Sequence, residues 1–251
     1  MSRRKTALVT GASRGIGRAI AQQLAADGLR VIVHYNSRLV EAEQTLASLN
    51  GAGHLVLCAD LADPDSVERL AKETLAACDG LVDVLVHNAG IYEDSPVLTT
   101  PTLAQWRYAL QRQMQVNFWA GADLAYLLAP AMAEAGWGKI VQIASRAGIR
   151  GENNCGGYAA SKAAQINLVK SLAKELAPNG IYSYGVAPGW TDTEMAADSL
   201  ARRGAEILAE TPLGRVATPQ DVAALVGFLV SPAADYLTGN TIDVNGASYL
   251  H

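Results

Sequence analysis

The chain contains few of the residues that build disulfide frameworks or metal sites. Among its 251 residues are 3 cysteines and 4 histidines. Cys58, Cys78 and Cys155 are widely spaced, which is typical of reduced thiols in the cytosol and not of a disulfide framework. Because neither residue type shows the short spacings of metal ligands, we expect no bound metal and no disulfide.

Charge of one sign and long apolar runs are also scarce. The formal net charge is −4 and basic residues do not gather along the chain, so the sequence lacks the footprint of a nucleic-acid-binding protein. No apolar run approaches the roughly 20 residues that span a bilayer, and the basic residues 3–5 precede an apolar stretch too short for a signal peptide. We therefore expect a cytoplasmic protein with neither a nucleic acid nor a membrane as partner.

Short strand-like runs alternate with longer helical patterns along the whole chain. The predicted strands cover residues 5–10, 30–35, 54–58, 82–87, 139–144, 181–187 and 241–244. Several of these runs are almost entirely apolar, as in parallel strands that helices cover on both faces. The alternation predicts one α/β domain over residues 1–251, a doubly wound Rossmann fold with a mainly parallel seven-stranded sheet. Its ligand site is expected at the carboxyl ends of the strands.

Two further local signals concern helices and a loop. Asp63-Pro64 and Thr218-Pro219 each offer an N-cap followed by proline at the first helical position, which marks the start of a helix. Residues 191–215 follow a predicted strand and are rich in polar and charged residues. We predict that they form a mobile lid of short helices over the substrate.

A glycine-rich turn follows the first predicted strand. Residues 10–17 read TGASRGIG and lead into a helical pattern at 18–27. Gly11, Gly15 and Gly17 allow a tight turn and a close approach of the backbone to a pyrophosphate, which the free N–H groups of a helix N-terminus bind. At the first strand-to-helix junction, this motif indicates a dinucleotide site.

The end of the second predicted strand favours NADP(H) over NAD(H). Residues 34–38 include no Asp or Glu, which would bind the ribose hydroxyls of NAD(H) and repel a 2′-phosphate. Arg14 and Arg38 offer charge-assisted hydrogen bonds to that phosphate. Asp60 is expected either to accept from the adenine amino group or to cap a turn. The residues predicted around the cofactor from these segments are Gly11, Ser13, Arg14, Gly15, Ile16, Gly17, Tyr35, Asn36, Ser37, Arg38, Asp60, Leu61, Asn88, Ala89 and Gly90.

Tyr158 and Lys162 are four positions apart in a predicted helix and therefore share one face. A tyrosine with an ordinary pKa near about 10 is a poor acid or base at neutral pH, and a nearby cation favours its phenolate. The pair alone is common. Here it occurs together with the glycine turn, the Asn-Ala-Gly of residues 88–90, Asn117 in a helical run, and Ser145 thirteen residues before Tyr158.

In order and spacing, these motifs resemble the short-chain dehydrogenase/reductase family from residue 10 to about residue 244. The resemblance implies four catalytic residues. Ser145 would hydrogen-bond the substrate oxygen, and Tyr158 would exchange its proton. Lys162 would lower the tyrosine pKa and bind the nicotinamide ribose, and Asn117 would hold a proton-relay water.

The resemblance also implies further contacts. The loop after the sixth predicted strand would position the nicotinamide through Pro188, Gly189, Thr191 and Thr193, and Tyr158 and Lys162 would contact the cofactor too. The helices within residues 117–135 and 157–177 would pack against copies of themselves in a homotetramer or a dimer.

The main functional prediction is an NADPH-dependent carbonyl reductase or alcohol dehydrogenase. It would transfer a hydride between the nicotinamide and a small-molecule ketone or secondary alcohol. One alternative is a 3-oxoacyl-[acyl-carrier-protein] reductase, although those reductases tend to carry basic residues where this chain has Gly136 and Asn179. The other alternative is a non-catalytic NADP(H)-sensing protein, which the presence of both Tyr158 and Lys162 disfavours.

Overall fold

The computed structural model describes residues 3–250, so residues 1, 2 and 251 of the predicted domain lie outside the described part. Its strands form one parallel sheet in the order β3-β2-β1-β4-β5-β6-β7. This confirms the predicted doubly wound α/β fold, with every strand parallel to its neighbours. The strands are β1 (Thr6–Val9), β2 (Arg30–Tyr35), β3 (Leu55–Cys58), β4 (Val84–His87), β5 (Gly138–Ile143), β6 (Ile181–Pro188) and β7 (Thr241–Val244).

The central strands are mostly apolar because both of their faces are covered. All residues of β1 and β4 are buried. Successive side chains of a strand point to opposite faces, so Ala7 and Val9 belong to one hydrophobic core and Leu8 to the other. Continuous apolar runs, and not an alternation with polar residues, are therefore what this sheet requires.

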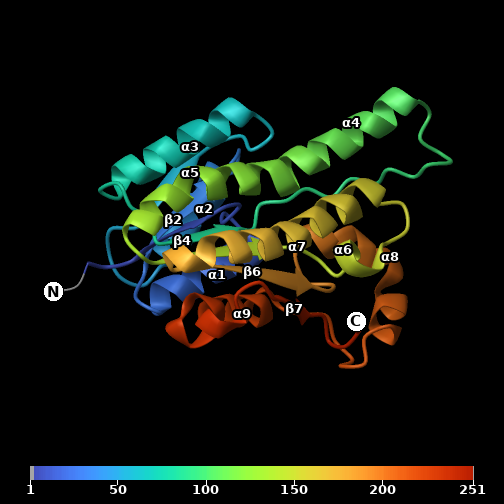
Figure 1. Ribbon diagram of the computed structural model, residues 1–251. Coiled ribbons are helices and arrows are strands. Elements are labelled where there is room, and N and C mark those ends of the chain that lie inside the picture. The colour runs from blue at the N-terminus through green and yellow to red at the C-terminus, as the bar shows by residue number, and fades with distance from the viewer. Residues whose placement is uncertain (1–2, 251) are drawn as a thin grey trace.

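Helices cover the two faces in two layers (Figure 1). On one face lie α1 (Gly15–Ala26), α2 (Leu39–Ala47) and α9 (Pro219–Val230), with residues in one core. On the other face lie α3 (Pro64–Ala77), α5 (Ala120–Glu134) and α7 (Gly156–Leu176), which contribute to the second core. The remaining helical segments are α4 (Leu103–Met114), α6 (Ala147–Arg150), α8 (Glu194–Ala209), a π-helix (Gln115–Trp119) and 3-10 turns at Ala177–Asn179 and Pro232–Leu237.

The two predicted helix starts are confirmed. Asp63 accepts a hydrogen bond from the backbone N–H of Asp65 at the start of α3. Thr218 and Asp221 form a reciprocal capping box at the start of α9. Each cap satisfies N–H groups that the first turn of a helix leaves without a partner.

The predicted lid contains α8, and the two ends of the lid segment are held together by a backbone bridge. Thr191 pairs with Ala217 in an isolated parallel bridge, so both ends of the segment are close together. The backbone leaves helical geometry at Arg203, with φ −127° and ψ 18°, and divides α8 into two shorter pieces. This division agrees with the prediction that the lid consists of short helices. The mobility of the segment stays a prediction.

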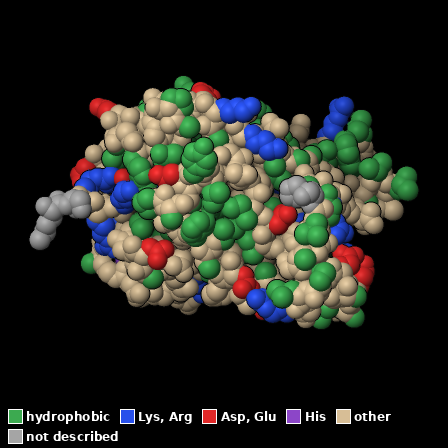
Figure 2. Space-filling model, turned by 60° about the horizontal axis from the view of Figure 1, so that its bottom comes forward, with side chains coloured by type: hydrophobic (Ala, Val, Ile, Leu, Met, Phe, Trp, Pro, Cys, Tyr) green, Lys and Arg blue, Asp and Glu red, His purple; other side chains and the backbone are tan. Residues whose placement is uncertain are grey.

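The surface is mixed in character. Acidic and basic side chains are interspersed on the face shown in Figure 2, and hydrophobic side chains gather near its centre. Within residues 3–250, none of the helices combines the length and the apolar character needed to cross a membrane.

Candidate active site

A cleft with a volume of about 940 Å³ opens at the carboxyl ends of the strands. Residues that follow β1, β2, β3, β4, β5 and β6 line it, together with residues of both parts of α8. All residues predicted to bind the cofactor lie on its wall, and so do Ser145, Tyr158 and Lys162. Asn117 is the exception among the predicted site residues, because it lies behind the wall. The roles of all these residues stay predictions.

The glycine turn forms the floor of the cleft. A Cβ atom on Gly17 would lie 2.3 Å from the carbonyl oxygen of Gly11, so that position tolerates no side chain. Gly11 and Gly15 have φ angles of 62° and 53°, which favour glycine. The N-cap residue of α1, Arg14, makes no side-chain cap, which leaves the N–H groups of the first turn available to an anion.

Two predicted cofactor residues have structural partners of their own. The Asn88 side-chain amide donates to the carbonyl oxygens of Thr10 at 2.9 Å and Gly11 at 3.1 Å, and so holds the glycine turn in shape. The Asp60 carboxylate accepts from the backbone N–H of Ala62 at 2.9 Å. Asp60 therefore closes a turn, which is the second of its two expected roles, while its surface still lines the cleft.

An acidic side chain lies where the sequence analysis expected none. The Glu194 carboxylate is 2.5 Å from the guanidinium of Arg14 and 3.5 Å from that of Arg38. Glu41 also pairs with Arg38, at 3.2 Å. The residues at the end of β2 include no acid, as the sequence shows, and α8 brings Glu194 to the same corner from the far end of the chain.

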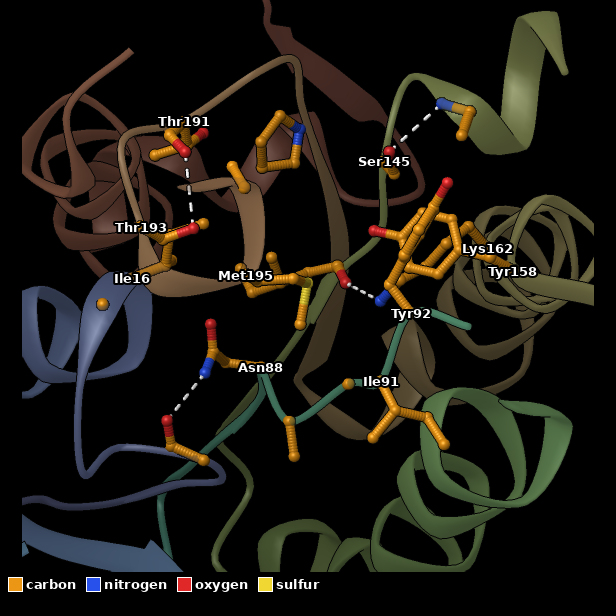
Figure 3. Close-up of a pocket in the computed structure, with 18 of the residues that line it drawn as sticks. Ile16, Asn88, Ile91, Tyr92, Ser145, Tyr158, Lys162, Thr191, Thr193 and Met195 are labelled. Carbon is orange, nitrogen blue, oxygen red and sulfur yellow. Dashed lines mark hydrogen bonds between the residues drawn. The ribbon is translucent and has the colours of Figure 1, made fainter. Parts of the chain in front are cut away.

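Ser145, Tyr158 and Lys162 gather on one side of the cleft, and Ile16, Thr191 and Thr193 lie on the other (Figure 3). The Lys162 ammonium donates to the carbonyl oxygen of Ile143 at 2.8 Å and lies 5.7 Å from the centre of the Tyr158 ring. The Ser145 hydroxyl accepts from the backbone N–H of Ala147 at 3.1 Å.

Burial moves the two titratable groups of this trio toward their neutral forms. It raises the pKa of Tyr158 to about 12, against a smaller lowering by the hydrogen bond with Ser145. It lowers the pKa of Lys162 to about 7. The resemblance implies a tyrosine pKa lowered by the lysine, and the chain alone shows the opposite direction, because the cost of burying a phenolate is the larger effect.

Tyr92 provides an aromatic wall beside the reacting groups. Its ring meets that of Tyr158 edge to face, with centroids 5.3 Å apart. Its hydroxyl donates to Asp94 at 2.9 Å. This edge-to-face contact restricts the orientation of the Tyr158 ring at the cleft.

Asn117 lies in the π-helix between α4 and α5, a wide turn that the sequence analysis did not predict. Its side-chain oxygen accepts from the N–H of Ile91 at 2.8 Å, and its amide donates to the carbonyl of Ile91 at 3.0 Å and to Ser161 at 2.9 Å. The amide therefore ties the loop after β4 to α7, one residue before Lys162. π-helical turns occur often at functional sites.

A chain of hydrogen bonds connects this π-helix to the glycine turn. The Thr10 hydroxyl accepts from the N–H groups of Asn88 and Ala89, each at 3.0 Å. Both of its lone pairs are then used, so it donates its hydrogen to Nδ1 of His87 at 3.2 Å. Nε2 of His87 lies 3.2 Å from the carbonyl oxygen of Asn117, which only accepts. His87 is therefore neutral, with its proton on Nε2.

A second buried histidine repeats this arrangement on the neighbouring strand. Nδ1 of His34 accepts from the N–H of Gly11 at 3.1 Å, and Nε2 faces the carbonyl oxygen of Ala59 at 3.1 Å. Burial lowers the pKa of His34 to about 4 and that of His87 to about 3. The glycine turn thus rests on two imidazoles that stay neutral.

Charged residues also line the substrate end of the cleft. Arg146 directly follows Ser145 and is only 3% exposed. It contacts Ser248 at 2.6 Å, Glu152 at 3.3 Å and Glu210 at 3.7 Å. Arg150 reaches the same two carboxylates, at 3.3 and 3.6 Å. Since Glu210 follows α8 directly, this cluster joins the end of the lid to the loop that carries Ser145.

The sequence analysis missed Glu194, Glu210, His34 and His87 as parts of the site. Each histidine directly follows three apolar residues of a strand, which is a usable signal for a buried polar group. The two glutamates carry no local signal, because their partners are far away in the sequence. Among residues 3–250, no three His, Cys, Asp or Glu side chains come together as metal ligands would.

Comparisons with known proteins agree on one kind of relative. The family model described as enoyl-(acyl carrier protein) reductase matches residues 11–247. The chain is 39% identical to the 3-oxoacyl-[acyl-carrier-protein] reductase FabG of Escherichia coli (strain K12) over 98% of both chains. It is 38% identical to FabG of Staphylococcus aureus (strain Mu50) over 100% of both.

Two solved structures are similar over nearly the whole chain. One is a short-chain dehydrogenase/reductase described as glucose/ribitol dehydrogenase from Brucella melitensis, with a TM-score of 0.88, 32% identity, and coverage of 98% of this chain and 97% of that one. The other is a putative NAD(P)-dependent gluconate 5-dehydrogenase from Beutenbergia cavernae with bound NADP. Its TM-score is 0.87 and its identity 38%, over 97% and 96% of the two chains.

The buried histidines predict how stability depends on pH. Both have folded-state pKa values below the ordinary value of about 6.5, so as pH falls from about 7 to 4 the unfolded chain takes up protons that the folded chain does not. The free energy of unfolding then falls, by about 1.4 kcal/mol per pH unit for each histidine. Urea denaturation at several pH values measures this slope.

His87→Gln, which keeps an N–H donor, is expected to remove one proton from this linkage. The slope between about pH 5.5 and 4 should fall by about 1.4 kcal/mol per pH unit. His54→Gln is the control, because that imidazole is only partly buried and its change in slope should be smaller. An unchanged slope in His87→Gln would show that His87 is not neutral in the folded protein.

Proposed function

The chain belongs to the short-chain dehydrogenase/reductase family, and from this membership we propose that Tyr158 is the general acid and base for a ketone or secondary alcohol. The chain is an oxidoreductase that acts on CH–OH and C=O groups with NADP(H). One observation carries the assignment of residues: Ser145, Tyr158 and Lys162 line one cleft together with the glycine turn.

The cleft fits a dinucleotide with a 2′-phosphate. A pyrophosphate suits the first turn of α1, whose N–H groups no side chain caps. A glycine is required at position 17, because a Cβ there would collide with the glycine turn itself. Arg14 and Arg38 would hold the 2′-phosphate, and the loop of residues 188–193 would hold the nicotinamide amide. The bound nicotinamide supplies or accepts the hydride. A structurally similar protein, described as a putative NAD(P)-dependent gluconate 5-dehydrogenase with bound NADP, supports this assignment.

The contacts of the trio suit proton transfer to an oxygen of the substrate. The N–H of Ala147 occupies a lone pair of Ser145, and the serine hydrogen, which is directed to Tyr158 in the chain alone, can be donated to the substrate oxygen instead. The Lys162 ammonium has three donors and uses one on Ile143. Its remaining donors and its charge stabilise a phenolate at Tyr158 and so oppose the effect of burial.

Asn117 acts in this proposal by positioning other groups. Its amide holds the loop of Ile91 against Ser161 of α7, so it fixes the distance between the wall of the cleft and the helix that carries Tyr158 and Lys162. We place no step of the proton transfer on its side chain.

Tyr158→Phe is expected to reduce kcat by at least about 100-fold, because the variant lacks the only hydroxyl that the proposal uses as acid and base. Oxidation of NADPH in the presence of a panel of ketones measures the loss. NADPH binding, followed by fluorescence titration, should be retained. The control is Tyr236→Phe, at a fully exposed ring.

Retention of most activity in Tyr158→Phe would remove Tyr158 from the mechanism. NADPH binding by the wild-type protein without turnover of any carbonyl or alcohol would instead favour the non-catalytic NADP(H)-sensing alternative.

Two substrate classes follow from different observations. The curated relatives at 38–39% identity are 3-oxoacyl-[acyl-carrier-protein] reductases, which supports a 3-oxoacyl thioester. The cluster of Arg146, Arg150, Glu152 and Glu210 at the substrate end favours instead a polar, hydroxylated keto acid. Gly136 and Asn179, where such reductases tend to carry basic residues, also speak against a carrier protein.

We propose the 3-oxoacyl thioester as the first substrate, because the likeness extends over the full chain. With NADPH, kcat/KM for acetoacetyl-coenzyme A should exceed that for a keto sugar acid by about tenfold or more, equivalent to about 1.4 kcal/mol of transition-state binding. Initial rates with both compounds measure the ratio. A reversed ratio would select the hydroxylated keto acid.

A homotetramer is the proposed assembly. Trp119 and Tyr126 are seven positions apart on the π-helix and α5, and their side chains are 51% and 80% exposed. Large apolar side chains on one helical face favour burial against a second copy. Light scattering should give a mass of about four times 26.4 kDa, and the mass of a single chain would contradict the proposal.

A further inference from the structure

Glu194 occupies the corner of the cleft that NADP(H) requires for its 2′-phosphate. One carboxylate oxygen, Oε2, lies 2.5 Å from Arg14 and 3.5 Å from Arg38. Arg14 belongs to the turn before α1, and Glu194 is the first residue of α8. The pair therefore joins the glycine turn to the lid across 180 residues of sequence.

We propose that Glu194 competes with the 2′-phosphate of NADP(H) for Arg14 and Arg38, so that NADP(H) releases the first part of α8 whereas NAD(H) leaves it in place. The inference rests on the proposed binding of NADP(H) in this cleft. In this inference, Glu194 determines which cofactor is preferred, and it couples the choice of cofactor to the position of the lid.

The charge balance of the corner supports competition. Arg14 and Arg38 already face two carboxylates, those of Glu41 and Glu194. A phosphate monoester adds a charge of about −1.5 to −2 at pH 7. Placed beside an unmoved Glu194, it would meet a like charge within the same few ångströms, so the phosphate and Glu194 compete for the same two guanidinium groups.

NAD(H) makes a different demand on the same carboxylate. It has a 2′-hydroxyl in place of the phosphate, and a carboxylate accepts a hydrogen bond from a hydroxyl. Glu194 can therefore keep its ion pair with Arg14 in an NAD(H) complex. The two cofactors differ in whether they displace the lid residue.

The fold allows Glu194 to move at low cost. The side chains of Glu194 and Arg14 are 60% and 41% exposed, and exposed ion pairs change an equilibrium only a few-fold. Glu194 also lies in the first turn of α8, where the helix dipole stabilises an acidic side chain without Arg14. The break at Arg203 separates this first part of α8 from the end that Arg146 and Arg150 hold through Glu210.

Glu41 offers a matched control within the same corner. It pairs with Arg38 at 3.2 Å, but it lies on α2, three residues from that arginine. Glu41→Gln removes the same charge from the same corner as Glu194→Gln and leaves the link between Arg14 and the lid intact. A general electrostatic effect would appear in both variants, and an effect on the lid only in Glu194→Gln.

The test measures binding without turnover. Isothermal titration of the full chain gives Kd values for NADP+ and NAD+. In Glu194→Gln, we expect NADP+ to bind about 2- to 5-fold more tightly, with NAD+ unchanged or weaker. Hydrogen exchange in residues 194–203 should rise when 2′,5′-ADP is added to the wild type and to Glu41→Gln. In Glu194→Gln it should be high already and should not respond.

Four outcomes would overturn the inference. Equal changes in the two Kd values would show that Glu194 does not distinguish the cofactors. An equal gain in selectivity in Glu41→Gln would reduce the effect to general electrostatics. Hydrogen exchange in the wild type that does not respond to 2′,5′-ADP would remove the coupling to the lid. Failure of the wild type to bind either nucleotide would overturn the proposed function and the inference together.

Discussion

The Thr10 hydroxyl is the contact on which the shape of the cleft depends. It lies at the end of β1, accepts hydrogen bonds from the backbone of the loop after β4, and donates to His87. Through His87 it reaches the π-helix of Asn117, and Asn117 in turn reaches the helix that carries Lys162. Because the groups in this series are buried and hydrogen-bonded to one another, a change at one of them alters the hydrogen bonding of its neighbours.

The fold brings the groups of the site together, but burial disfavours the charged forms of Tyr158 and Lys162. Burial favours a neutral phenol at Tyr158 and lowers the pKa of Lys162 to about 7, so it opposes the charged form of each group. Acid and base chemistry needs the charged forms as well. The unused donors of Lys162 and the hydroxyl of Ser145 are therefore positioned for polar groups of a ligand. Contacts with those groups stabilise the charged forms that burial disfavours.

The signals for the fold and for most residues that line the cleft are local in the sequence, and both could be predicted from it. Apolar runs gave the parallel sheet, and the spacing of Tyr158 and Lys162 on one helical face placed them side by side. The approach of Glu194 to Arg14 could not be predicted, because it depends on where the lid lies after folding. The π-helix at Asn117 was missed for a related reason: the hydrogen bond from His87 that accompanies it comes from another strand.

The packing of α1 on α9 on the same face of the sheet has a consequence for the newborn chain. Ile20 and Leu24 of α1 are fully buried in a core that also contains Val222 and Val226 of α9. During synthesis, α1 and the first three strands leave the ribosome long before residue 219 does. The apolar side of α1 thus stays uncovered through most of translation, when such surfaces are prone to aggregation. The helix that begins the nucleotide site is therefore covered on its apolar side only after α9 has been made.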